Sequence, residues 1–539
     1  MRPFGDIRLR PAVVVAGALG TLALFAGPAR ADGEFDRAFA DGGRLEFALA
    51  SATGSLGDLV VLGDGSVVAT GRSEPGGLDL ARATPGGLLD TAFGSLTGLE
   101  DVGGRALLRL ADGGVLVAGD QDVPVSAGEA GAAPLGPGPR PRRAVLAGFT
   151  RTGVTDTTYA TAGLAVPPLP GSDASFGALA ASGGMFLAAG DTTINGARRF
   201  LIARLDRNGV LDPSFGSGGV VTIAPEGGGD ASVRALLVDT GGAIVAAGGA
   251  TVAGDQRAAV VRLTADGRPD VTFGGGDGAV TFRFGAAQGE AADVTIQPGT
   301  GVSGRRILVA GSAGFTGRRR YALARLLANG AADRRFGTRG FASAPDVGGT
   351  GATRMVLNPN RTIVLAGGGR ADGDGVLALA RFLPQGTLDT SFGGDGFVTT
   401  VARSGGSDAA RGLVRRVDGT LVAGGSAGAA GDHEWLLARF RQACGSSLGC
   451  VSLAPVGREA RLAVDPAAPV RLGALVLSRG RPVGTVILGR VAAGPVELGW
   501  DLRVKGRRLP RGVYRVRLRS LDGSGRIVAA GPEIRLPVP

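Results

Sequence analysis

An aspartate recurs seven times along the chain, always three residues before an aromatic residue. A repeated carboxylate could serve as a catalytic acid or base, or it could accept backbone hydrogen bonds within a turn. Catalysis needs one asymmetric group of residues, whereas a residue that returns in every unit serves that unit. We therefore interpret the set as structural. The motif D-x-x-[FY] occurs at Asp36/Phe39, Asp90/Phe93, Asp156/Tyr159, Asp212/Phe215, Asp270/Phe273, Asp333/Phe336 and Asp389/Phe392.

An arginine lies in an apolar strand before most copies of the motif, across a short turn. The arginines are Arg82, Arg204, Arg262, Arg325, Arg381 and Arg439. The copy at Asp156 departs most, with Gly148 in place of Arg and Tyr159 in place of Phe. The spacing puts each Arg within ion-pair reach of an Asp. We predict the pairs Arg204/Asp212, Arg262/Asp270, Arg325/Asp333, Arg381/Asp389 and, between the two ends of the repeats, Arg439/Asp36.

Other side chains offer little for catalysis. The single histidine, His433, cannot assemble a catalytic triad or a histidine-rich metal centre. Glycine-rich runs open no helix, so they lack the context of a phosphate-binding loop. We therefore expect no cofactor and no metal. An alternative is a glycan-active enzyme whose acid and base come from the unrepeated carboxylates Asp255, Glu290, Asp293 or Asp408.

The motifs define seven units of about 55 to 65 residues, a period typical of propellers and solenoids. Each unit also contains a short apolar run ending in glycine, at Gly71, Gly119, Gly190, Gly248, Gly311, Gly367 and Gly424. The apolar stretches are short and separated by Gly-containing turns, which indicates four antiparallel strands per unit. The fold class predicted is all-β, with a seven-bladed β-propeller of four-stranded blades over residues 32–443.

The two ends of the repeat region complement each other. The last copy stops at Phe440 without a following D-x-x-F motif, while the chain supplies one at Asp36 near its start. The N-terminal strand is therefore expected to close the propeller. An open solenoid is the alternative, but it would more often carry atypical capping repeats.

Residues 1–31 have the pattern of a signal peptide. Three arginines precede an apolar run, and Ala29-Arg30-Ala31 forms a cleavage site that would leave Asp32 as the first residue. We expect export by the general secretory route, a secreted or cell-surface location, no transmembrane segment after cleavage, and a monomer.

The pattern changes after Phe440. Cys444 and Cys450 are the only cysteines, and we predict a disulfide between them in the junction 444–450. Residues 451–539 indicate a separate small β-sandwich. Trp500-Asp501 followed by Pro510-Arg511-Gly512-Val513-Tyr514 resembles the immunoglobulin-like domain of flagellar hook-capping proteins, and that resemblance implies a spacer or adaptor.

The repeat resembles the delta-60 repeat family of bacterial exported proteins. The closest stretches are LARFLPQGTLDTSFGGDG at Leu379–Gly396 and IARLDRNGVLDPSFGSGG at Ile202–Gly219. The likeness covers residues 32 to about 440. It implies a propeller-like β architecture and export, but no activity.

The formal charge of +11 is a mild basic bias. Codon composition is one explanation of this bias, and attraction to an acidic envelope polymer is the other. Aromatic residues make up only 5% of the chain, which disfavours nucleic-acid platforms and sugar-stacking clefts. We expect a secreted, non-enzymatic binding or structural module whose propeller loops meet a protein or polymer of the envelope. The alternative is a propeller-type glycan-active hydrolase or lyase.

Overall fold

The structure is a computed structural model, and it describes most of the residues that follow the predicted signal peptide. The residues described are 33–47, 53–74, 77–94, 99, 101–123, 141–227, 229–299, 304–315, 318–346, 348–371, 374–400, 409–416, 418–428, 434–442, 452–456, 459–464, 470–479, 481–491, 496–521 and 526–538. The predicted signal peptide, Asp408, His433, Cys444 and Cys450 lie outside them. The described residues all belong to one compact unit, Ala31–Pro539.

The all-β prediction is confirmed. The described residues form 36 strands and one short 3-10 turn, η1 (Pro225–Gly227), with no α-helix. No helix in the described part is long and apolar enough to span a membrane. Short apolar segments bounded by glycine turns favour hairpins over helices, because they carry no apolar stripe of helical period.

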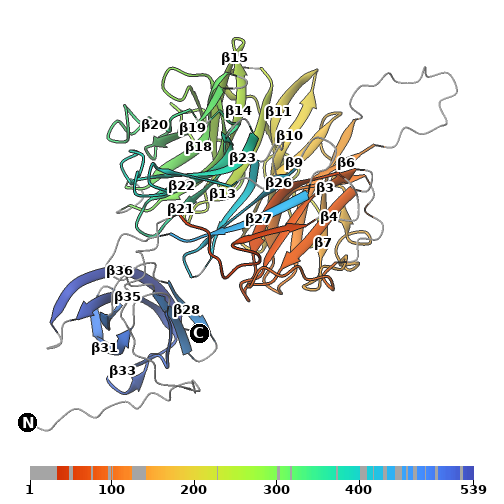
Figure 1. Cartoon of the computed structure of the whole chain (residues 1–539). Coiled ribbons are helices and arrows are strands. Elements are labelled where there is room, and N and C mark those ends of the chain that lie inside the picture. Colours follow the sequence, from red (N-terminus) through yellow and green to blue (C-terminus); the bar gives the residue numbers. More distant parts are fainter. Residues whose placement is uncertain are drawn as a thin grey trace, which may run out of the picture. The chain divides into compact units, whose positions relative to one another are not determined.

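Seven antiparallel sheets follow one another between residues 44 and 440 (Figure 1). The first in the chain, with three described strands, is β2 (Thr53–Val61), β3 (Val67–Glu74) and β4 (Gly77–Ala83). Five four-stranded sheets come next: β5 (Val102–Arg109), β6 (Val115–Asp122), β7 (Arg142–Phe149) and β8 (Leu164–Ala165); β9 (Ala174–Ser182), β10 (Met185–Ile194), β11 (Ala197–Leu205) and β12 (Val220–Ile223); β13 (Ala231–Val238), β14 (Ile244–Val252), β15 (Asp255–Leu263) and β16 (Ala279–Phe282); β17 (Gly289–Gln297), β18 (Arg306–Phe315), β19 (Arg318–Leu326) and β20 (Phe341–Ser343); β21 (Gly351–Leu357), β22 (Ile363–Ala371), β23 (Asp374–Phe382) and β24 (Phe397–Thr400).

The seventh sheet combines the two ends of the repeat region. It contains β25 (Ala409–Arg415), β26 (Leu421–Ala427) and β27 (Glu434–Phe440), and its fourth strand is β1 (Arg44–Phe47). β1 pairs antiparallel with β27, with Arg44 opposite Ala438 and Phe47 opposite Trp435. The N-terminal strand therefore completes the sheet that the C-terminal repeat begins.

The first strand of each of these sheets in chain order, β2, β5, β9, β13, β17, β21 or β25, is called its inner strand here. Each inner strand contacts the inner strand of the next sheet, and β25 contacts β2. Apolar side chains fill the space between neighbouring sheets. At the junction of the last and first sheets, Trp435 and Leu437 lie in one buried cluster with Leu56, Leu59 and Val67.

The repeated Arg, Asp and Phe form one contact set. In Arg204, Nε lies 2.7 Å from Asp212 Oδ2, and the guanidinium carbon lies 4.8 Å from the ring centre of Phe215. All five predicted ion pairs are present, and Arg82 pairs with Asp90 in the same way.

The stacking of each Arg on the Phe of its motif was not predicted. The distance from guanidinium carbon to ring centre is 4.6 to 4.9 Å in all six copies. Besides Arg204 on Phe215, the stacked pairs are Arg82 on Phe93, Arg262 on Phe273, Arg325 on Phe336, Arg381 on Phe392 and Arg439 on Phe39. A cation over an aromatic face adds attraction to the ion pair. The phenylalanine is therefore a partner of the arginine as well as a core residue.

The same set joins neighbouring sheets. Arg204 donates a hydrogen bond of 2.6 Å to the carbonyl of Ala265 in the next sheet, and the Gly216 amide donates to Asp266 O at 2.9 Å. The hairpin glycine Gly267 packs so closely on Phe215 that an added Cβ would lie 2.7 Å from the ring. Equivalent arginine bonds run from Arg82 to Arg151 O, Arg262 to Ala328 O, Arg325 to Pro384 O and Arg439 to Pro85 O.

The departures at Gly148 and Tyr159 compensate each other. A Cβ added to Gly148 would lie 2.8 Å from the Tyr159 ring. The tyrosine ring therefore fills the space that an Arg side chain at position 148 would need. Asp156 then accepts hydrogen bonds from Thr158, at 3.0 Å from its amide and 2.6 Å from its hydroxyl. This turn keeps its shape without the ion pair.

Residues 452–538 form a three-stranded sheet, β28 (Ser452–Val456), β29 (Glu459–Val464) and β32 (Val496–Trp500), and a four-stranded sheet, β31 (Arg481–Val491), β30 (Val470–Ser478), β35 (Gly512–Leu521) and β36 (Ile527–Val538), with a hairpin of β33 (Arg503–Val504) and β34 (Arg507–Arg508). Trp500 and Tyr514 lie in the core, and the Tyr514 hydroxyl donates to Pro510 O at 2.9 Å. The immunoglobulin-like assignment stays a prediction.

Candidate functional site

Every inner strand contains a β-bulge at the same place. One extra residue on the inner strand interrupts its pairing with the second strand of its sheet. A bulge re-aims the side chain of its extra residue. The extra residues are Gly57, Arg105, Gly177, Arg234, Ala292, Thr353 and Arg411.

The repeated glycines at the ends of the apolar runs lie opposite these bulges. A Cβ at Gly248 would overlap the carbonyl oxygen of Ser232 on the inner strand, so only glycine allows the two backbones to approach this closely. The other sheets have the same arrangement at Gly71, Gly119, Gly190, Gly311, Gly367 and Gly425. The register shows that the seventh member is Gly425, opposite Ala410, and that the assignment to Gly424 is wrong by one residue.

All seven bulge residues line one cavity of about 470 Å³. Such a volume lies in the range of roughly 300 to 1,000 Å³ that is typical of small-molecule sites. The lining contains six arginines, three acidic residues and several Ser and Thr hydroxyls, but no aromatic ring. The cavity is thus built from residues that differ between the sheets.

The residues repeated in the sequence lie outside this cavity. The lining includes none of the aromatic residues Phe39, Phe93, Tyr159, Phe215, Phe273, Phe336 and Phe392, none of the aspartates Asp36, Asp90, Asp156, Asp212, Asp270, Asp333 and Asp389, and none of the arginines Arg82, Arg204, Arg262, Arg325, Arg381 and Arg439. All seven aromatic rings are buried. Each ring instead packs against a glycine from the following copy of the repeat: Gly87 on Phe39, Gly153 on Phe93, Gly209 on Tyr159, Gly267 on Phe215, Gly330 on Phe273, Gly386 on Phe336 and Gly33 on Phe392. The repeated residues therefore hold neighbouring sheets together and take no part in the candidate site.

Four arginines in the lining interact electrostatically. Burial, together with the like charges of Arg354, Arg234 and Arg105, lowers the pKa of Arg411. The side chains of Arg411, Arg234 and Arg105 are exposed and line the cavity, so water in the cavity reaches these charges. The cavity thus concentrates positive charge from β5, β13, β21 and β25.

Two of these arginines lack a protein partner. Arg105 pairs with Asp120, and Arg354 lies 3.5 Å from Asp58 Oδ1. Among the residues that the structure describes, Arg234 and Arg411 have neither a hydrogen bond nor an ion pair. A guanidinium that faces a cavity without an acceptor is suited to binding an anion.

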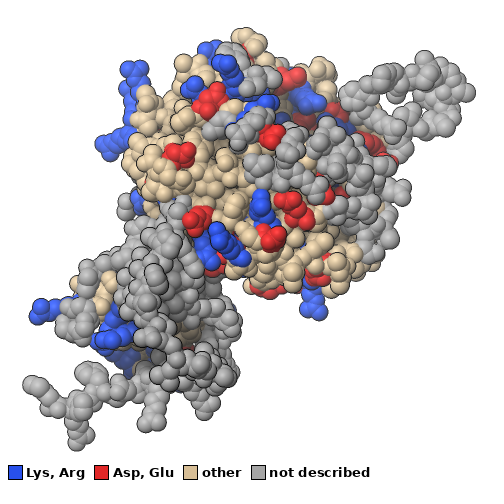
Figure 2. Space-filling model, viewed as in Figure 1, with Lys and Arg blue, Asp and Glu red and all other residues tan. Residues whose placement is uncertain are grey.

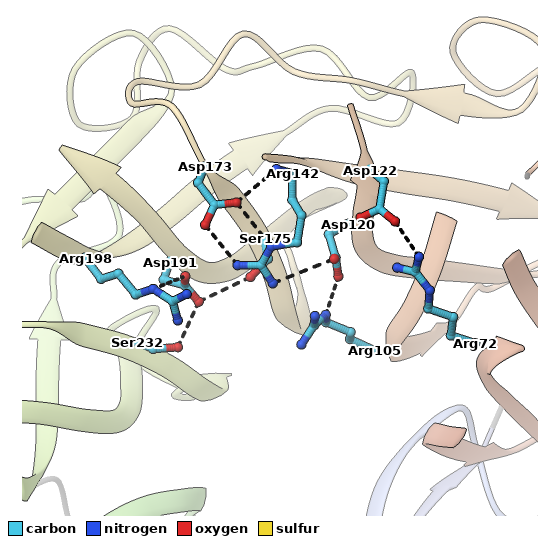
Figure 3. A network of polar contacts seen from close by, with 10 residues as sticks. All are labelled: Arg72, Arg105, Asp120, Asp122, Arg142, Asp173, Ser175, Asp191, Arg198 and Ser232. Carbon is cyan, nitrogen blue, oxygen red and sulfur yellow. Dashed lines mark hydrogen bonds and ion pairs between the residues drawn. The ribbon is translucent and has the colours of Figure 1, made fainter. Parts of the chain in front are cut away.

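Two acidic residues of the lining, Asp120 and Asp191, belong to a network of polar contacts (Figure 3). Asp191 Oδ1 accepts hydrogen bonds from Ser232 at 2.9 Å and Ser175 at 3.2 Å, and Arg198 lies 3.9 Å from its Oδ2. Figure 3 shows Asp120 between Arg105 and Arg142, with Arg142 Nη1 3.8 Å from Asp120 Oδ2. Both Oδ2 atoms are buried and accept no hydrogen bond within the described residues.

Asp58 and Asp293 follow the bulges of β2 and β17 directly, outside the cavity lining. Asp293 accepts backbone hydrogen bonds of 2.7 Å from Met355 and Val294, and Asp58 accepts one of 3.0 Å from Leu107. Burial raises the pKa of Asp293 to about 6, against the opposing charge of Arg354. Burial likewise raises the pKa of Asp58.

The other unrepeated carboxylates lie apart. Glu290 lines the cavity, with Arg319 Nη1 2.9 Å from its Oε1. Asp255 is paired at 2.6 Å with Arg283 and at 3.2 Å with Arg257; the hydrogen bond from Arg283 is the main cause of its lowered pKa. No group of three or more metal-ligating side chains occurs within the described ranges. Of the three candidate acids that the structure describes, Glu290 lines the cavity, and Asp255 and Asp293 do not.

Four parts of the chain match a family model described as "Domain of unknown function (DUF5122) beta-propeller": residues 184–215, 242–273, 305–336 and 359–392. Each matched segment covers the second and third strands of a sheet and ends at the Phe of its D-x-x-F motif. The chain is thus a β-propeller repeat protein. No curated protein matches its sequence. The delta-60 assignment stays a prediction.

Solved structures show distant similarity. Drosophila semaphorin 2a is 9% identical, with 94% of this chain and 99% of that chain covered and a TM-score of 0.39. A GH43 endo-arabinanase from Bacillus licheniformis is 12% identical, with coverages of 53% and 92% and a TM-score of 0.28. The extracellular domain of a hybrid two-component system from B. thetaiotaomicron is 9% identical, with coverages of 90% and 68% and a TM-score of 0.26.

Proposed function

We propose that this protein is an exported, non-enzymatic binding module in which a closed seven-bladed β-propeller holds an anionic ligand in its axial cavity. Closure is supported by β1 pairing with β27 and by the contact between β25 and β2. Seven inner strands that surround one cavity correspond to seven blades around an axis.

The observation that carries the ligand class is the pair Arg234 and Arg411. Two guanidinium groups without a described protein partner face a cavity that also contains Arg105 and Arg354. Their mutual repulsion costs stability, and an anion bound between them would offset that cost. Function then explains a local cluster of charge that folding alone does not favour.

A binding role is favoured over catalysis because every acid in the lining is held by Arg or Ser. A glycan-active hydrolase or lyase is the second candidate. It is supported by Asp293, whose pKa of about 6 suits proton transfer near neutral pH. Asp293 is, however, committed to two backbone amides and does not line the cavity.

The C-terminal residues suggest where the protein is retained. Residues 451–539 contain 16 basic and six acidic residues, whereas residues 32–450 contain 38 and 40. The basic excess is therefore concentrated in residues 451–539. Arg503, Lys505 and Arg507 are exposed in this part, and Figure 2 shows blue side chains on it. We propose that this domain attaches to an anionic envelope polymer at the cell surface.

Titration calorimetry of the full exported chain with sulfate and acetate tests the binding role. We expect Arg234→Gln and Arg411→Gln each to weaken anion binding about tenfold or more, because charged hydrogen bonds contribute about 1.5 to 3 kcal/mol. Arg268→Gln is the control, since its side chain is 82% exposed and lies outside the lining. Equal binding by all variants, or turnover of a glycan abolished by Asp293→Asn, would contradict the proposal.

Retention at the envelope is tested separately. The triple variant Arg503→Glu, Lys505→Glu, Arg507→Glu should release the protein from envelope fractions at lower salt than the parent chain, because surface attraction weakens with ionic strength. Arg268→Glu should leave the salt dependence unchanged. Salt-independent retention of the triple variant would argue against a charged attachment.

A further inference from the structure

The cavity lining contains arginine donors and aspartate acceptors whose hydrogen-bonding capacity is not filled within the described residues. Arg234 and Arg411 offer donors without a described acceptor. Asp120 and Asp191 each have an Oδ2 atom that accepts no hydrogen bond within the described residues, with the nearest arginine nitrogen 3.8 Å away in Arg142 and 3.9 Å away in Arg198. Both carboxylates are well buried, with Asp120 1% and Asp191 6% exposed. Buried polar atoms normally have partners, so a set of unpartnered atoms around one cavity points to a missing ligand.

The positions of the two acids follow from the strand register. Asp120 in β6 lies opposite Gly103 in β5, and Asp191 in β10 lies opposite Ser175 in β9. Gly103 has no side chain, but Arg105 of the same strand pairs with Asp120 Oδ1. Asp191 is oriented by the hydroxyls of Ser175 and Ser232, which use its Oδ1 and leave Oδ2 free of hydrogen bonds.

The lining further restricts the ligand. A carboxylate that lacks a donor binds hydroxyl or amine hydrogens, and Ser and Thr hydroxyls both donate and accept. The lining has no aromatic ring on which a base or an aromatic ring could stack, and its aliphatic side chains are small or few. A fatty acid would leave the polar groups of the described lining unpaired, which costs binding energy, and the base of a nucleotide would find no ring there on which to stack.

We propose that the ligand is a polyhydroxylated oxyanion, such as a uronic acid or a sugar phosphate. Its carboxylate or phosphate lies against Arg234 and Arg411, and its hydroxyls donate to Asp120 and Asp191. This inference rests on the proposed binding role and specifies the ligand that fills the cavity.

The test compares probes that carry each feature alone or both together, by titration calorimetry on the full chain. Galacturonate and glucose 6-phosphate carry both features; acetate and inorganic phosphate carry only charge; glucose carries only hydroxyls. We expect at least one of the first pair to bind ten times or more tighter than its simple anion, and glucose not to bind. The stronger of the two identifies the source of the oxyanion.

Variants separate the two halves of the site. Asp191→Asn should reduce affinity for the hydroxylated anion to that of the simple anion, whose own affinity stays unchanged. Arg411→Gln should reduce both. Asp266→Asn, at an exposed hairpin outside the lining, should change neither. Cooperative thermal unfolding with melting temperatures within about 4 °C of the parent shows that the variants fold.

The failures are distinguishable. Simple anions that bind as tightly as hydroxylated ones, with Asp191→Asn having no effect, would overturn this inference and leave the anion-binding proposal standing. No binding by any charged probe would overturn both.

Discussion

Arg439 and Asp36 form an ion pair between the two ends of the repeat region, with Nε 2.7 Å from Oδ2 and both side chains less than a tenth exposed. Arg439 also stacks on Phe39 at 4.9 Å and donates to Pro85 O at 2.6 Å. A second arginine, Arg441, lies 2.7 Å from the other oxygen of Asp36. One carboxylate thus joins β27, the N-terminal segment and the next sheet.

Removing one partner of this pair should destabilise the whole propeller. We expect Arg439→Gln to lower the free energy of unfolding by about 1.5 to 3 kcal/mol, because it removes a buried hydrogen bond between charged groups while Arg441 still compensates the charge of Asp36. Urea denaturation followed by tryptophan fluorescence measures the change, since Trp435 lies in the adjoining cluster. Arg503→Gln, which breaks an exposed pair with Asp501, should cost less than about 1 kcal/mol. Equal urea midpoints for the two variants would show that the junction between the two ends of the repeat region does not depend on the pair.

Acid should unfold the protein through the repeated aspartates. Burial raises the pKa of Asp36, but the hydrogen bond from Arg441 and the charges of Arg439 and Arg441 outweigh it and hold the pKa below its usual value. A lowered folded-state pKa gives stability that is present above the unfolded pKa of about 3.9 and is lost as pH falls through the folded value. Five further aspartates have lowered pKa values: Asp90, Asp212, Asp270, Asp333 and Asp389. Denaturation from pH 6 to pH 2 should show a steep loss below about pH 4, and Asp36→Asn should make the loss shallower. A flat profile would contradict this.

Asp293 should have the opposite pH dependence. Its pKa of about 6 exceeds the unfolded value, so its effect on stability grows less favourable as pH rises from about 4 through 6. The groups facing it are the Met355 and Val294 amides and the charges of Arg354 and Asp58. Asp293→Asn should gain about 2 kcal/mol more at pH 7.5 than at pH 4, measured as the difference in unfolding free energy from the parent. A constant difference across this range would mean that Asp293 is ionised throughout.

The glycines opposite the bulges should not tolerate a side chain. Gly248→Ala places a Cβ on the carbonyl oxygen of Ser232, so a strand must shift, and we expect a loss of about 2 kcal/mol or more in unfolding free energy. Gly241→Ala is the matched control, since a Cβ there meets nothing within 4 Å. Similar melting temperatures for both variants would argue that the bulge relaxes easily.

Two buried tyrosine hydroxyls should respond differently to removal. Tyr321 donates to Ala378 O at 2.9 Å, so Tyr321→Phe leaves a buried acceptor weakened and should cost about 1 kcal/mol. The Tyr159 hydroxyl is buried without a described partner, so Tyr159→Phe should cost nothing or stabilise the protein. Thermal unfolding of the two variants provides the comparison, and a larger loss for Tyr159→Phe would indicate a bound water or ligand at that hydroxyl.

The sequence repeat predicted most of the architecture between residues 32 and 440. The recurrence of Asp, Arg and Gly predicted strands, turns and five ion pairs, because these contacts are local and identical in each unit. The stacking of Arg204 on Phe215 was not predicted, although the fixed spacing of Arg and Phe in the copies that carry both residues indicates it. The split in charge between residues 32–450 and 451–539 could likewise have been counted from the sequence.

The cavity could not be found in the same way. Arg105, Arg234, Arg354 and Arg411 come from four sheets, and each follows or occupies a bulge that only pairing register reveals. Arg105 and Arg234 both begin the sequence Arg-Ala-Leu-Leu, but that sequence alone does not indicate a shared cavity. Local composition determined which segments are strands and how each turn is held, since those contacts span a few residues. Which unrepeated side chains line the same cavity was decided by long-range packing of whole sheets, because that packing converts equivalent positions in distant units into neighbours.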